Sequence, residues 1–401
     1  MGCLFFVFTE TGLNVIISYQ ITGDDVMKIN LIGNPEIVME NRNSLHNYFG
    51  WPTLARLKNG AIAAAASGNR VAHVCPFGKA VMALSYDEGK TFSKQSIVID
   101  TVLDDRDAGL CPFGESGLIF TSFTLSKSHI NDYLTDPGLI TCGCEKYIDY
   151  AAAYLEHIPE DMNQQFKGST FCISFDNGQT FSEIYNGPVT SPHGPCELSD
   201  GTILWVGPRH TGDRGKSLNK DILAFKINLD GTSEQLGTIP RFENDEGYLY
   251  CEPHAIELPN GRIICHIRVQ GGINKATGEK KNHFTIYQSE SEDGGRTWSI
   301  PQQILSDNGG SPAHLMVHSS GMLISTYGYR EAPYGVRAMF SEDGGRTWDT
   351  DNVIYINNVN GDLGYPSTVE LSDGSLLTLF YAHKDADSPA EIYKVKWSFE
   401  K

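Results

Sequence analysis

The chain has 401 residues and carries 31 lysines and arginines against 49 aspartates and glutamates, so its net charge is −18. This excess of acidic groups argues against nucleic acid and against an anionic membrane surface as the main partner. No apolar run reaches the ~18 residues that a membrane-spanning helix needs. An anionic ligand would therefore have to bind in a local basic pocket that opposes the charge of the whole protein.

Residues 1–26 differ from the rest of the chain. Residues 1–19 are fairly apolar, but they lack a basic start, contain Glu10 and have no small-residue cleavage site, so we expect no signal peptide. Met27 precedes a strand-like run, which favours residues 1–26 as an N-terminal extension and residues 27–401 as one domain. The nine cysteines show no spacing typical of a disulfide framework, and free thiols favour a reducing, cytoplasmic location.

Six segments of the chain read as apolar strand, glycine turn, apolar strand. Asn-Gly, Asp-Gly and Ser-Gly pairs between β-rich runs are typical of hairpins. The turn glycines are Gly60, Gly117, Gly201, Gly261, Gly321 and Gly374. Most of the steps between consecutive turn glycines have similar lengths. This repetition predicts an all-β fold, a six-bladed β-propeller with four antiparallel strands in each blade.

One step between turn glycines, from Gly117 to Gly201, is clearly longer than the others. It contains residues 126–168, in which the run DYAAAYLEHI has the pattern of a helix. We expect a small helical insertion between the second and third blades. Such an insertion either covers one face of the propeller as a lid or forms a surface loop without a role in binding.

A second repeat has the form Ser-x-Asp-x-Gly-x-Thr-aromatic, and its four copies begin at Ser85, Ser174, Ser291 and Ser341. The aspartate can accept hydrogen bonds from backbone N–H groups of its own turn, the glycine provides a residue with positive φ, and the aromatic ring can pack against a sheet. In the first blade the phrase starts well after the hairpin glycine, Gly60. This spacing predicts a structural turn between the outer two strands of a blade.

The inner strands of a propeller begin close to its axis, so the residues just before each hairpin are expected to line one central funnel. Residues at the end of the hairpin's second strand are expected at the same rim. These positions are rich in charged and polar side chains, namely Trp51, His73, Asp105, Arg106, Asp107, His193, Glu252, His254, Arg268, Arg330 and Tyr365. Because guanidinium groups bind carboxylates in a bidentate manner, the arginines indicate an acidic sugar as ligand.

Four of these residues form the strongest constellation: Glu252, Arg268, Arg330 and Tyr365. A glutamate next to a tyrosine can take the phenolic proton, which turns a group with an ordinary pKa of about 10 into a useful nucleophile. A neutral phenol also avoids repulsion by a carboxylate on the carbon that it attacks. The alternative is structural, with Glu252 and Arg268 as an ion pair between strands and Tyr365 as a cap on the core.

With these motifs the chain resembles the sialidase superfamily of six-bladed Asp-box propellers over nearly its whole length. In that family a glutamate and an arginine flank one hairpin, as Glu252 and Arg268 do. A further arginine precedes an Asp-box strand, as Arg330 does before YGVRAMFSEDGGRTW, and a tyrosine opens the last hairpin, as Tyr365 does in GYPSTVELSDG. The resemblance implies that the two arginines bind the substrate carboxylate, and that Tyr365 is a nucleophile whose proton passes to Glu252.

Two positions depart from the family pattern. The first arginine of the family, in an Arg-Ile-Pro phrase, is replaced in FGWPTL by Gly50, and Trp51 follows it. The acidic residue expected before the first Asp box is replaced by His73, which can also act as an acid or base near neutral pH. Other residues offer the missing groups, with Arg70 or Arg106 as the cation and Asp105 or Asp107 as the acid.

The register also turns His193 and His254 toward the funnel, where each either contacts substrate or has a structural role. The resemblance implies an exo-acting glycoside hydrolase that releases a terminal sialic acid or a related carboxylated sugar with retention. Its partner would be a carbohydrate, it would need no cofactor, and no His or Cys spacing indicates a metal site. A second hypothesis is a propeller α-L-rhamnosidase or polysaccharide lyase that acts on uronate-containing glycans through His73. A third is a glycan-binding propeller without catalytic activity.

Overall fold

The computed structural model describes residues 27–135, 147–213, 221–243, 245, 247–272, 278–279 and 283–401. The expected N-terminal extension, residues 1–26, lies outside the described residues. In the part of the chain that the structure describes, no helix is long and apolar enough to cross a lipid bilayer.

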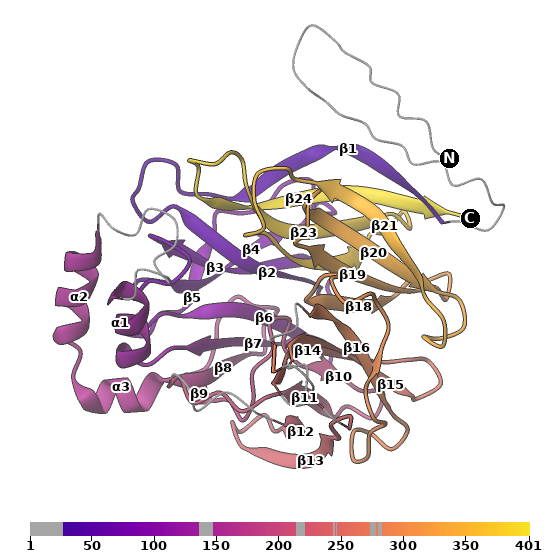
Figure 1. Ribbon diagram of the computed structural model, residues 1–401, viewed down its shortest axis with the longest axis horizontal. Coiled ribbons are helices and arrows are strands. Elements are labelled where there is room, and N and C mark those ends of the chain that lie inside the picture. Colours follow the sequence, from indigo (N-terminus) through magenta and orange to yellow (C-terminus); the bar gives the residue numbers. More distant parts are fainter. Residues whose placement is uncertain are drawn as a thin grey trace, which may run out of the picture.

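Six four-stranded sheets surround a common centre, which makes the protein a six-bladed β-propeller (Figure 1). Paired strands in every sheet are antiparallel. The first five blades take their strands in chain order. Blade one is β2 (Tyr48–Arg56), β3 (Ile62–Arg70), β4 (Lys79–Ser85) and β5 (Ser96–Ile99); blade two is β6 (Arg106–Phe113), β7 (Gly117–Thr124), β8 (Gly168–Ser174) and β9 (Tyr185–Asn186). Blade three is β10 (Cys196–Glu197), β11 (Ile203–Gly207), β12 (Ile222–Ile227) and β13 (Ser233–Ile239); blade four is β14 (Tyr248–Glu257), β15 (Ile263–Gly271), β16 (Phe284–Ser291) and β17 (Gln302–Gln303); blade five is β18 (Ala313–Val317), β19 (Leu323–Tyr329), β20 (Gly335–Ser341) and β21 (Asp349–Ile356).

The sixth blade joins the two ends of the described chain. Its strands are β22 (Gly364–Glu370), β23 (Leu376–His383), β24 (Ala390–Glu400) and, at the outer edge, β1 (Lys28–Met39). Lys28 lies opposite Glu400 in the β1–β24 pair, and their side chains form an exposed ion pair of 2.6 Å. The N-terminal strand thus closes the ring, and the all-β, six-bladed fold that the sequence predicts is confirmed.

The core lies between adjacent blades, because each sheet is covered on both faces by its neighbours. Strand β3 shows why the sequence suits this arrangement: residues 62–66 read IAAAA, and all of them are fully buried. Small side chains let the sheets approach closely near the axis. Tyr48, Leu54, Leu379 and Tyr381 belong to one buried cluster that joins blades one and six. Burial of a side chain such as leucine contributes roughly 1.5–3 kcal/mol each.

The repeated serine–aspartate turns join the third and fourth strands of blades one, two, four and five, as predicted. In the first turn the Ser85 hydroxyl accepts the N–H of Gly89 at 2.9 Å, and Asp87 accepts the N–H and hydroxyl of Thr91 at 2.9 and 2.6 Å. The other three turns repeat these bonds. Gly89 has a φ of +72°, and a Cβ there would lie 2.3 Å from Leu377, so glycine lets the turn pack against blade six.

The predicted helical insertion is present, but its position needs correction. Helices α1 (Lys127–Thr135), α2 (Ile148–Glu156) and α3 (Glu160–Phe166) lie between β7 and β8, inside blade two and not between blades two and three. Thr124 and Gly168 still pair across this connection, because a hairpin tolerates a long insertion at a modest entropic cost. In Figure 1 the helices lie at the edge of the propeller, away from its centre.

These helices support the loop that follows β3. Phe77 in this loop stacks on Tyr150 at a ring distance of 4.8 Å and lies 5.0 Å from the ring of Tyr154. The Tyr154 hydroxyl donates to the carbonyl of Val102 at 3.1 Å. The insertion therefore holds the segment that carries His73. Residues 136–146, which belong to the predicted lid, lie outside the described residues.

Candidate active site

Four inner strands carry a residue with positive φ at the equivalent place, near the start of the strand. These residues are Trp51 (φ 53°), Asp107 (φ 43°), Glu252 (φ 49°) and Tyr365 (φ 48°). Each lies where the pairing register of its strand shifts, as in a β-bulge. Positive φ is uncommon for residues other than glycine, and both bulges and backbone strain concentrate at functional sites. The backbone thus marks four blades that contribute to one centre.

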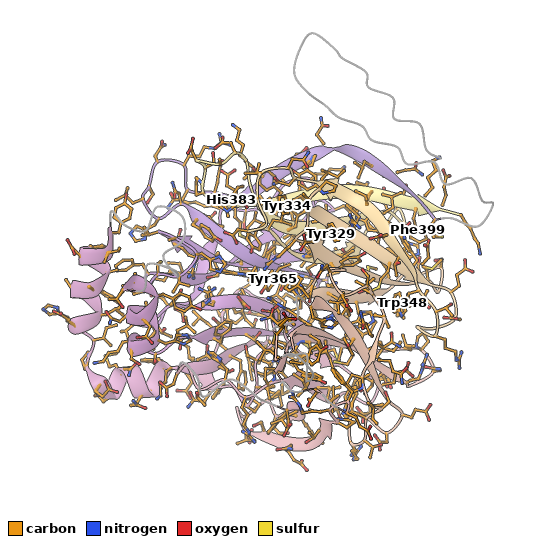
Figure 2. All side chains as sticks on the ribbon, in the orientation of Figure 1. Tyr329, Tyr334, Trp348, Tyr365, His383 and Phe399 are labelled. Carbon is orange, nitrogen blue, oxygen red and sulfur yellow. The ribbon has the colours of Figure 1, made fainter. Side chains whose placement is uncertain are left out.

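Tyr365 and Glu252 form a hydrogen-bonded pair at this centre. The Tyr365 hydroxyl donates to Glu252 Oε1 at 2.7 Å. Arg268 Nη1 donates to Glu252 Oε2 at 2.6 Å and to the Tyr365 oxygen at 3.3 Å. Burial, and then the charge of Glu252, raise the pKa of Tyr365 well above its ordinary value. The phenol is therefore neutral and donates to a carboxylate, Glu252, that can take its proton. Figure 2 shows Tyr365 near the middle of the propeller.

Arg330 lies next to this pair. Its guanidinium carbon is 5.5 Å from the centre of the Tyr365 ring, its Nε donates to the carbonyl of Leu363 at 3.1 Å, and its Nη2 donates to the Tyr381 hydroxyl at 3.2 Å. The ring of Phe284 lies near both arginines, 4.6 Å from the guanidinium carbon of Arg268 and 5.7 Å from that of Arg330. The structure thus brings together the four residues of the strongest predicted constellation.

Asp107 approaches the same centre from blade two. Its side chain is buried, and burial together with the charge of Glu252 raises its pKa to about 7, although Arg106 opposes this shift. The charge of Arg268 also lowers the pKa of Asp107. A pKa close to 7 suits a group that donates and later accepts a proton.

Trp51, which follows the position of the missing arginine, is enclosed by the arginines of blades one and two. The guanidinium carbons of Arg106 and Arg70 lie 4.1 and 4.9 Å from the centre of its ring. Arg70 is fully buried and pairs with Asp104 at 2.6 Å, whereas Arg106 donates to the carbonyl of His73 at 2.7 Å. Trp51 itself is 2 % exposed. These cations therefore support the wall of the funnel, and Arg70 does not reach its surface.

Asp105 is buried and held by hydrogen bonds within its own loop. It is fully buried and accepts the N–H and the hydroxyl of Thr101 at 2.8 and 2.9 Å. Burial raises its pKa to about 7, and the hydrogen bonds from Thr101 oppose this effect. Because both carboxylate oxygens are held by Thr101, the structure separates Asp105 from Asp107, which the sequence could not do.

His73 lies at the rim and contacts a carboxylate that the sequence analysis missed, Asp362. His73 Nδ1 is 3.1 Å from Asp362 Oδ1, which also accepts the Tyr381 hydroxyl at 2.9 Å. The other oxygen of Asp362 accepts the Tyr48 hydroxyl at 2.8 Å and lies 3.1 Å from His383 Nε2. Burial raises the pKa of Asp362, but these hydrogen bonds outweigh it and hold the pKa well below its ordinary value. Asp362 therefore connects His73 to Arg330 through Tyr381.

Burial lowers the pKa of His73, and the opposing effect of Asp362 is smaller. The ring is 32 % exposed and lies 4.9 Å from the ring of Trp51. A neutral imidazole at the rim can accept a proton, but it is a poor proton donor at neutral pH. The only sequence signal for Asp362 is its place just before Gly364 and Tyr365 at the start of the last hairpin.

His193 and His254 lie with His314 in a buried group. Their ring centres are 4.5 to 5.5 Å apart. His254 Nδ1 accepts the N–H of Leu315 at 2.9 Å, and burial lowers the pKa of His254 to about 3. Burial also lowers the pKa of His193 well below its ordinary value. Both predicted histidines are therefore neutral groups of the core. Among the described residues, no set of three or more His, Cys, Asp or Glu side chains is arranged to hold a metal ion.

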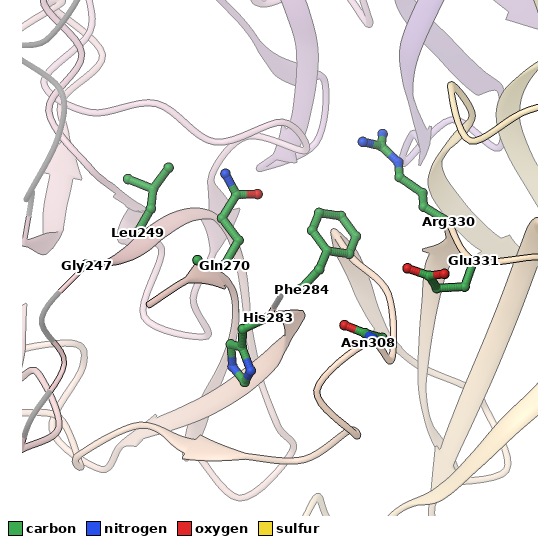
Figure 3. Close-up of a pocket in the computed structure, with 9 residues that line it drawn as sticks. Gly247, Leu249, Gln270, His283, Phe284, Asn308, Arg330 and Glu331 are labelled. Carbon is green, nitrogen blue, oxygen red and sulfur yellow. The ribbon is translucent and has the colours of Figure 1, made fainter. Parts of the chain in front are cut away.

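A pocket of about 440 Å³ opens beside Arg330, between blades four and five (Figure 3). Leu249, Gln270, Phe284, Asn308, Arg330 and Glu331 line it. Gln270 Oε1 accepts Nε and Nη2 of Arg268 at 2.9 and 2.5 Å, so the pocket adjoins the Glu252–Tyr365 centre.

A family model described as a BNR repeat-like domain matches residues 157–378, just over half of the chain. The chain belongs to this family. The BNR-repeat family assignment and the propeller together confirm the predicted membership of the sialidase superfamily of BNR-repeat propellers. A comparison with curated protein sequences gave no match.

Solved structures show the same fold at low sequence identity. A protein of unknown function from Dyadobacter fermentans is 18 % identical, with a TM-score of 0.70 over 94 % of this chain and 100 % of that one. A sialidase from Streptococcus pneumoniae is 12 % identical, with a TM-score of 0.60 over 91 % and 70 %. An α-L-arabinofuranosidase from Fusarium graminearum is 13 % identical, with a TM-score of 0.58 over 90 % and 96 %. This BNR-repeat protein therefore shares its architecture with several glycoside hydrolases.

Proposed function

We propose that this BNR-repeat protein is an exo-acting glycoside hydrolase that releases a terminal carboxylated sugar, sialic acid or a related one, with retention. The observation that carries the proposal is the bonded set of Tyr365, Glu252 and Arg268 with Arg330 beside it. Similarity in fold to sialidases supports the same assignment. The six described cysteines without disulfide partners favour a reducing compartment such as the cytoplasm.

In the first step Arg268 and Arg330 would bind the sugar carboxylate, and Tyr365 would attack the anomeric carbon. As the new bond forms, the phenolic proton passes to Glu252, across the 2.7 Å hydrogen bond that already joins the two. The bond to the leaving oxygen breaks, and protonated Asp107 gives that oxygen its proton. The raised pKa of Asp107 favours it for this role over His73, whose pKa is lowered.

In the second step ionised Asp107 would take a proton from water as the water attacks the anomeric carbon. The bond to Tyr365 then breaks, and Glu252 returns the proton to the phenol. Two displacements at one carbon give net retention of configuration. Atoms balance, with one water consumed for each sugar released.

Release of free sugar from an aryl sialoside or from sialyl-lactose tests this proposal. We expect turnover by the wild-type protein and none by Tyr365→Phe. Absence of release from a folded wild-type preparation, shown to be folded by its circular dichroism and cooperative melting, would contradict the proposal.

A second candidate is a lyase that acts on uronate-containing glycans. The contact between His73 Nδ1 and Asp362 favours it, because this contact orients a neutral imidazole whose other nitrogen can accept the proton next to a uronate carboxylate. Elimination would form an unsaturated uronide without consuming water. A rise in ultraviolet absorbance on addition of a polyuronate identifies this reaction, and hydrolysis does not produce it.

A further inference from the structure

His383, at the end of β23, lies between two groups that can only accept hydrogen bonds. Its Nδ1 is 2.7 Å from the carbonyl oxygen of Ser388, and its Nε2 is 3.1 Å from Oδ2 of Asp362. The side chain is 3 % exposed, so water has little access to it. A neutral imidazole has one N–H and could donate only one of these bonds, whereas an imidazolium donates both. The two contacts therefore favour a positively charged His383.

Asp362 is an anion in this arrangement. Its Oδ1 accepts the Tyr381 hydroxyl at 2.9 Å and lies 3.1 Å from His73 Nδ1, and its Oδ2 accepts the Tyr48 hydroxyl at 2.8 Å. With the bond from His383, four donors surround the carboxylate, which matches the acceptor capacity of its two oxygens. The carboxylate thus has no hydrogen of its own to donate, and it pairs with His383 as an anion.

The charged groups that face His383 stabilise its protonated form. Asp362 precedes β22, and Asp385 lies in the loop between β23 and β24. Burial lowers the pKa of His383, but the hydrogen bonds that its ring makes and the charges of Asp362 and Asp385 outweigh this effect and raise the pKa above its ordinary value. The ring of Tyr48, from β2, lies 6.0 Å away and is uncharged, because burial raises the pKa of Tyr48 well above its ordinary value.

We propose that His383 is a positioning residue of the catalytic centre, because its positive charge neutralises Asp362. In this state His73 stays neutral, and Arg330 remains available for the carboxylate of the substrate. His73 contacts Asp362 directly, whereas Arg330 donates to Tyr381, which donates to Asp362. Without the imidazolium, the negative charge of Asp362 would favour protonation of His73 and would compete for the guanidinium of Arg330. The part of this inference that concerns the substrate rests on the proposed hydrolase function.

The two histidines provide a test that does not require turnover. Nitrogen-15 nuclear magnetic resonance on the whole protein distinguishes a ring with two N–H groups from a ring with one. At pH 6 we expect hydrogen on both nitrogens of His383, and at pH 7.5 we expect hydrogen on Nδ1 alone of His73. The variant His383→Gln removes the charge, so the pKa of His73 should rise in it.

His318→Gln is the matched control. The ring of His318 also lies near a carbonyl oxygen and a carboxylate, 2.9 Å from that of Gly374 and 3.3 Å from that of Glu370. It precedes β19, whereas Arg330 follows that strand, so its replacement should leave the titration of His73 unchanged. A single N–H on His383 at pH 6, or the same His73 titration in wild type and both variants, would overturn the proposal whether or not the protein cleaves a sialoside.

Kinetics separate the positioning role from a purely structural one. With an aryl sialoside, His383→Gln should raise KM about three- to tenfold with little change in kcat. The KM of wild type should approach that of the variant as the pH rises through the raised pKa of His383, because the imidazolium then loses its charge. The variant should lack this part of the pH dependence. Since Asp107 also has a pKa of about 7 and is present in both proteins, their difference reports on His383 alone.

A double variant gives the sharpest test of the mechanism. In the Asp362→Asn background there is no negative charge to neutralise, so His383→Gln should change KM far less there than in wild type. A structural role predicts the same loss in both backgrounds, and that result would overturn the proposal. If wild type cleaves no sialoside, the hydrolase proposal fails, and the titrations of His383 and His73 decide the present one.

Discussion

Two walls of the funnel use the same residue types in different ways. In blades four to six, Arg268 and Arg330 lie beside Tyr365 and keep exposed surface. In blades one and two, Arg70 and Arg106 lie against Trp51 and bond to Asp104 and backbone carbonyls. Asp104, which holds Arg70 and Arg106, is fully buried, whereas Glu252, which pairs with Arg268, keeps part of its surface exposed. We therefore expect the first two arginines to support the wall and Arg268 and Arg330 to bind the ligand. Four predictions test this distinction.

The largest effect is expected for Tyr365→Phe. Loss of the phenolic oxygen removes the nucleophile and the hydrogen bond to Glu252 but keeps the ring that packs near Arg330. We expect kcat to fall by roughly 10⁴-fold or more, with little change in folding. The matched control is Tyr381→Phe, another buried tyrosine of blade six, for which the loss in kcat should be far smaller. Equal losses of kcat in Tyr365→Phe and Tyr381→Phe would contradict the role of Tyr365 as the nucleophile.

Asp107→Asn is expected to lower kcat by ~10²–10⁴-fold with natural leaving groups. The protonated form of Asp107 is the acid, so wild-type activity should decline as the pH rises through about 7, and the variant should lose this basic limb. Aryl glycosides with acidic phenols need no proton on departure, and their first step should be nearly unaffected. If the Asp107→Asn variant keeps the decline of activity above pH 7, another group is the acid. The pH profile of His73→Asn would then show whether that group is His73.

Arg330→Ala is expected to act mainly on binding. Loss of a charged hydrogen bond of about 1.5–3 kcal/mol corresponds to a roughly 10- to 100-fold rise in KM for an acidic sugar. Arg106→Ala should change KM much less but lower the melting temperature, because its guanidinium holds the His73 carbonyl and the ring of Trp51. If Arg106→Ala raised KM more than Arg330→Ala does, the wall of blades one and two would be the one that binds the sugar.

Asp362→Asn should have the smallest effect on turnover, a few-fold, since Asp362 acts on Arg330 through Tyr381. Its effect on stability should be clearer. The pKa of Asp362 is depressed in the folded protein, so the stability that its carboxylate contributes is present above the unfolded pKa of about 4 and is lost as the pH falls below it. Denaturant melts of wild type and Asp362→Asn should therefore differ at pH 7 and converge in acid. A constant difference across this range would contradict the assignment.

The sequence predicts features that depend on local chemistry. Each serine–aspartate turn makes its own hydrogen bonds, so four copies identify the outer edges of four blades without knowledge of the rest. Tyr365 and Glu252 stand at recognisable places in the repeat, each just before a proline at the start of an inner strand. Features that depend on contacts between distant segments were not predictable. The burial of Arg70 depends on Asp104 and Trp51, and the role of Asp362 depends on residues of blades one and six.

The helical insertion shows the same limit. Its composition predicts helices, but spacing alone does not say between which strands an insertion falls. That depends on the pairing of β7 with β8, which is determined by hydrogen bonds between segments far apart in the sequence, such as those of Thr124 and Gly168. The spacing of the turn glycines therefore placed the insertion after the fourth strand of blade two, whereas it lies between the second and third strands, β7 and β8.

The pairing of β1 with β24 has a consequence for synthesis of the protein. Strand β24, which ends at Glu400, closes the ring by pairing with β1, so the circle of blades cannot be completed until β24 has left the ribosome. Until then, β1 and β23 both present open edges, which are templates for association with other nascent chains. A premature stop that removes β24 would leave this exposure permanent, and we expect such products to aggregate rather than to accumulate as five-bladed proteins.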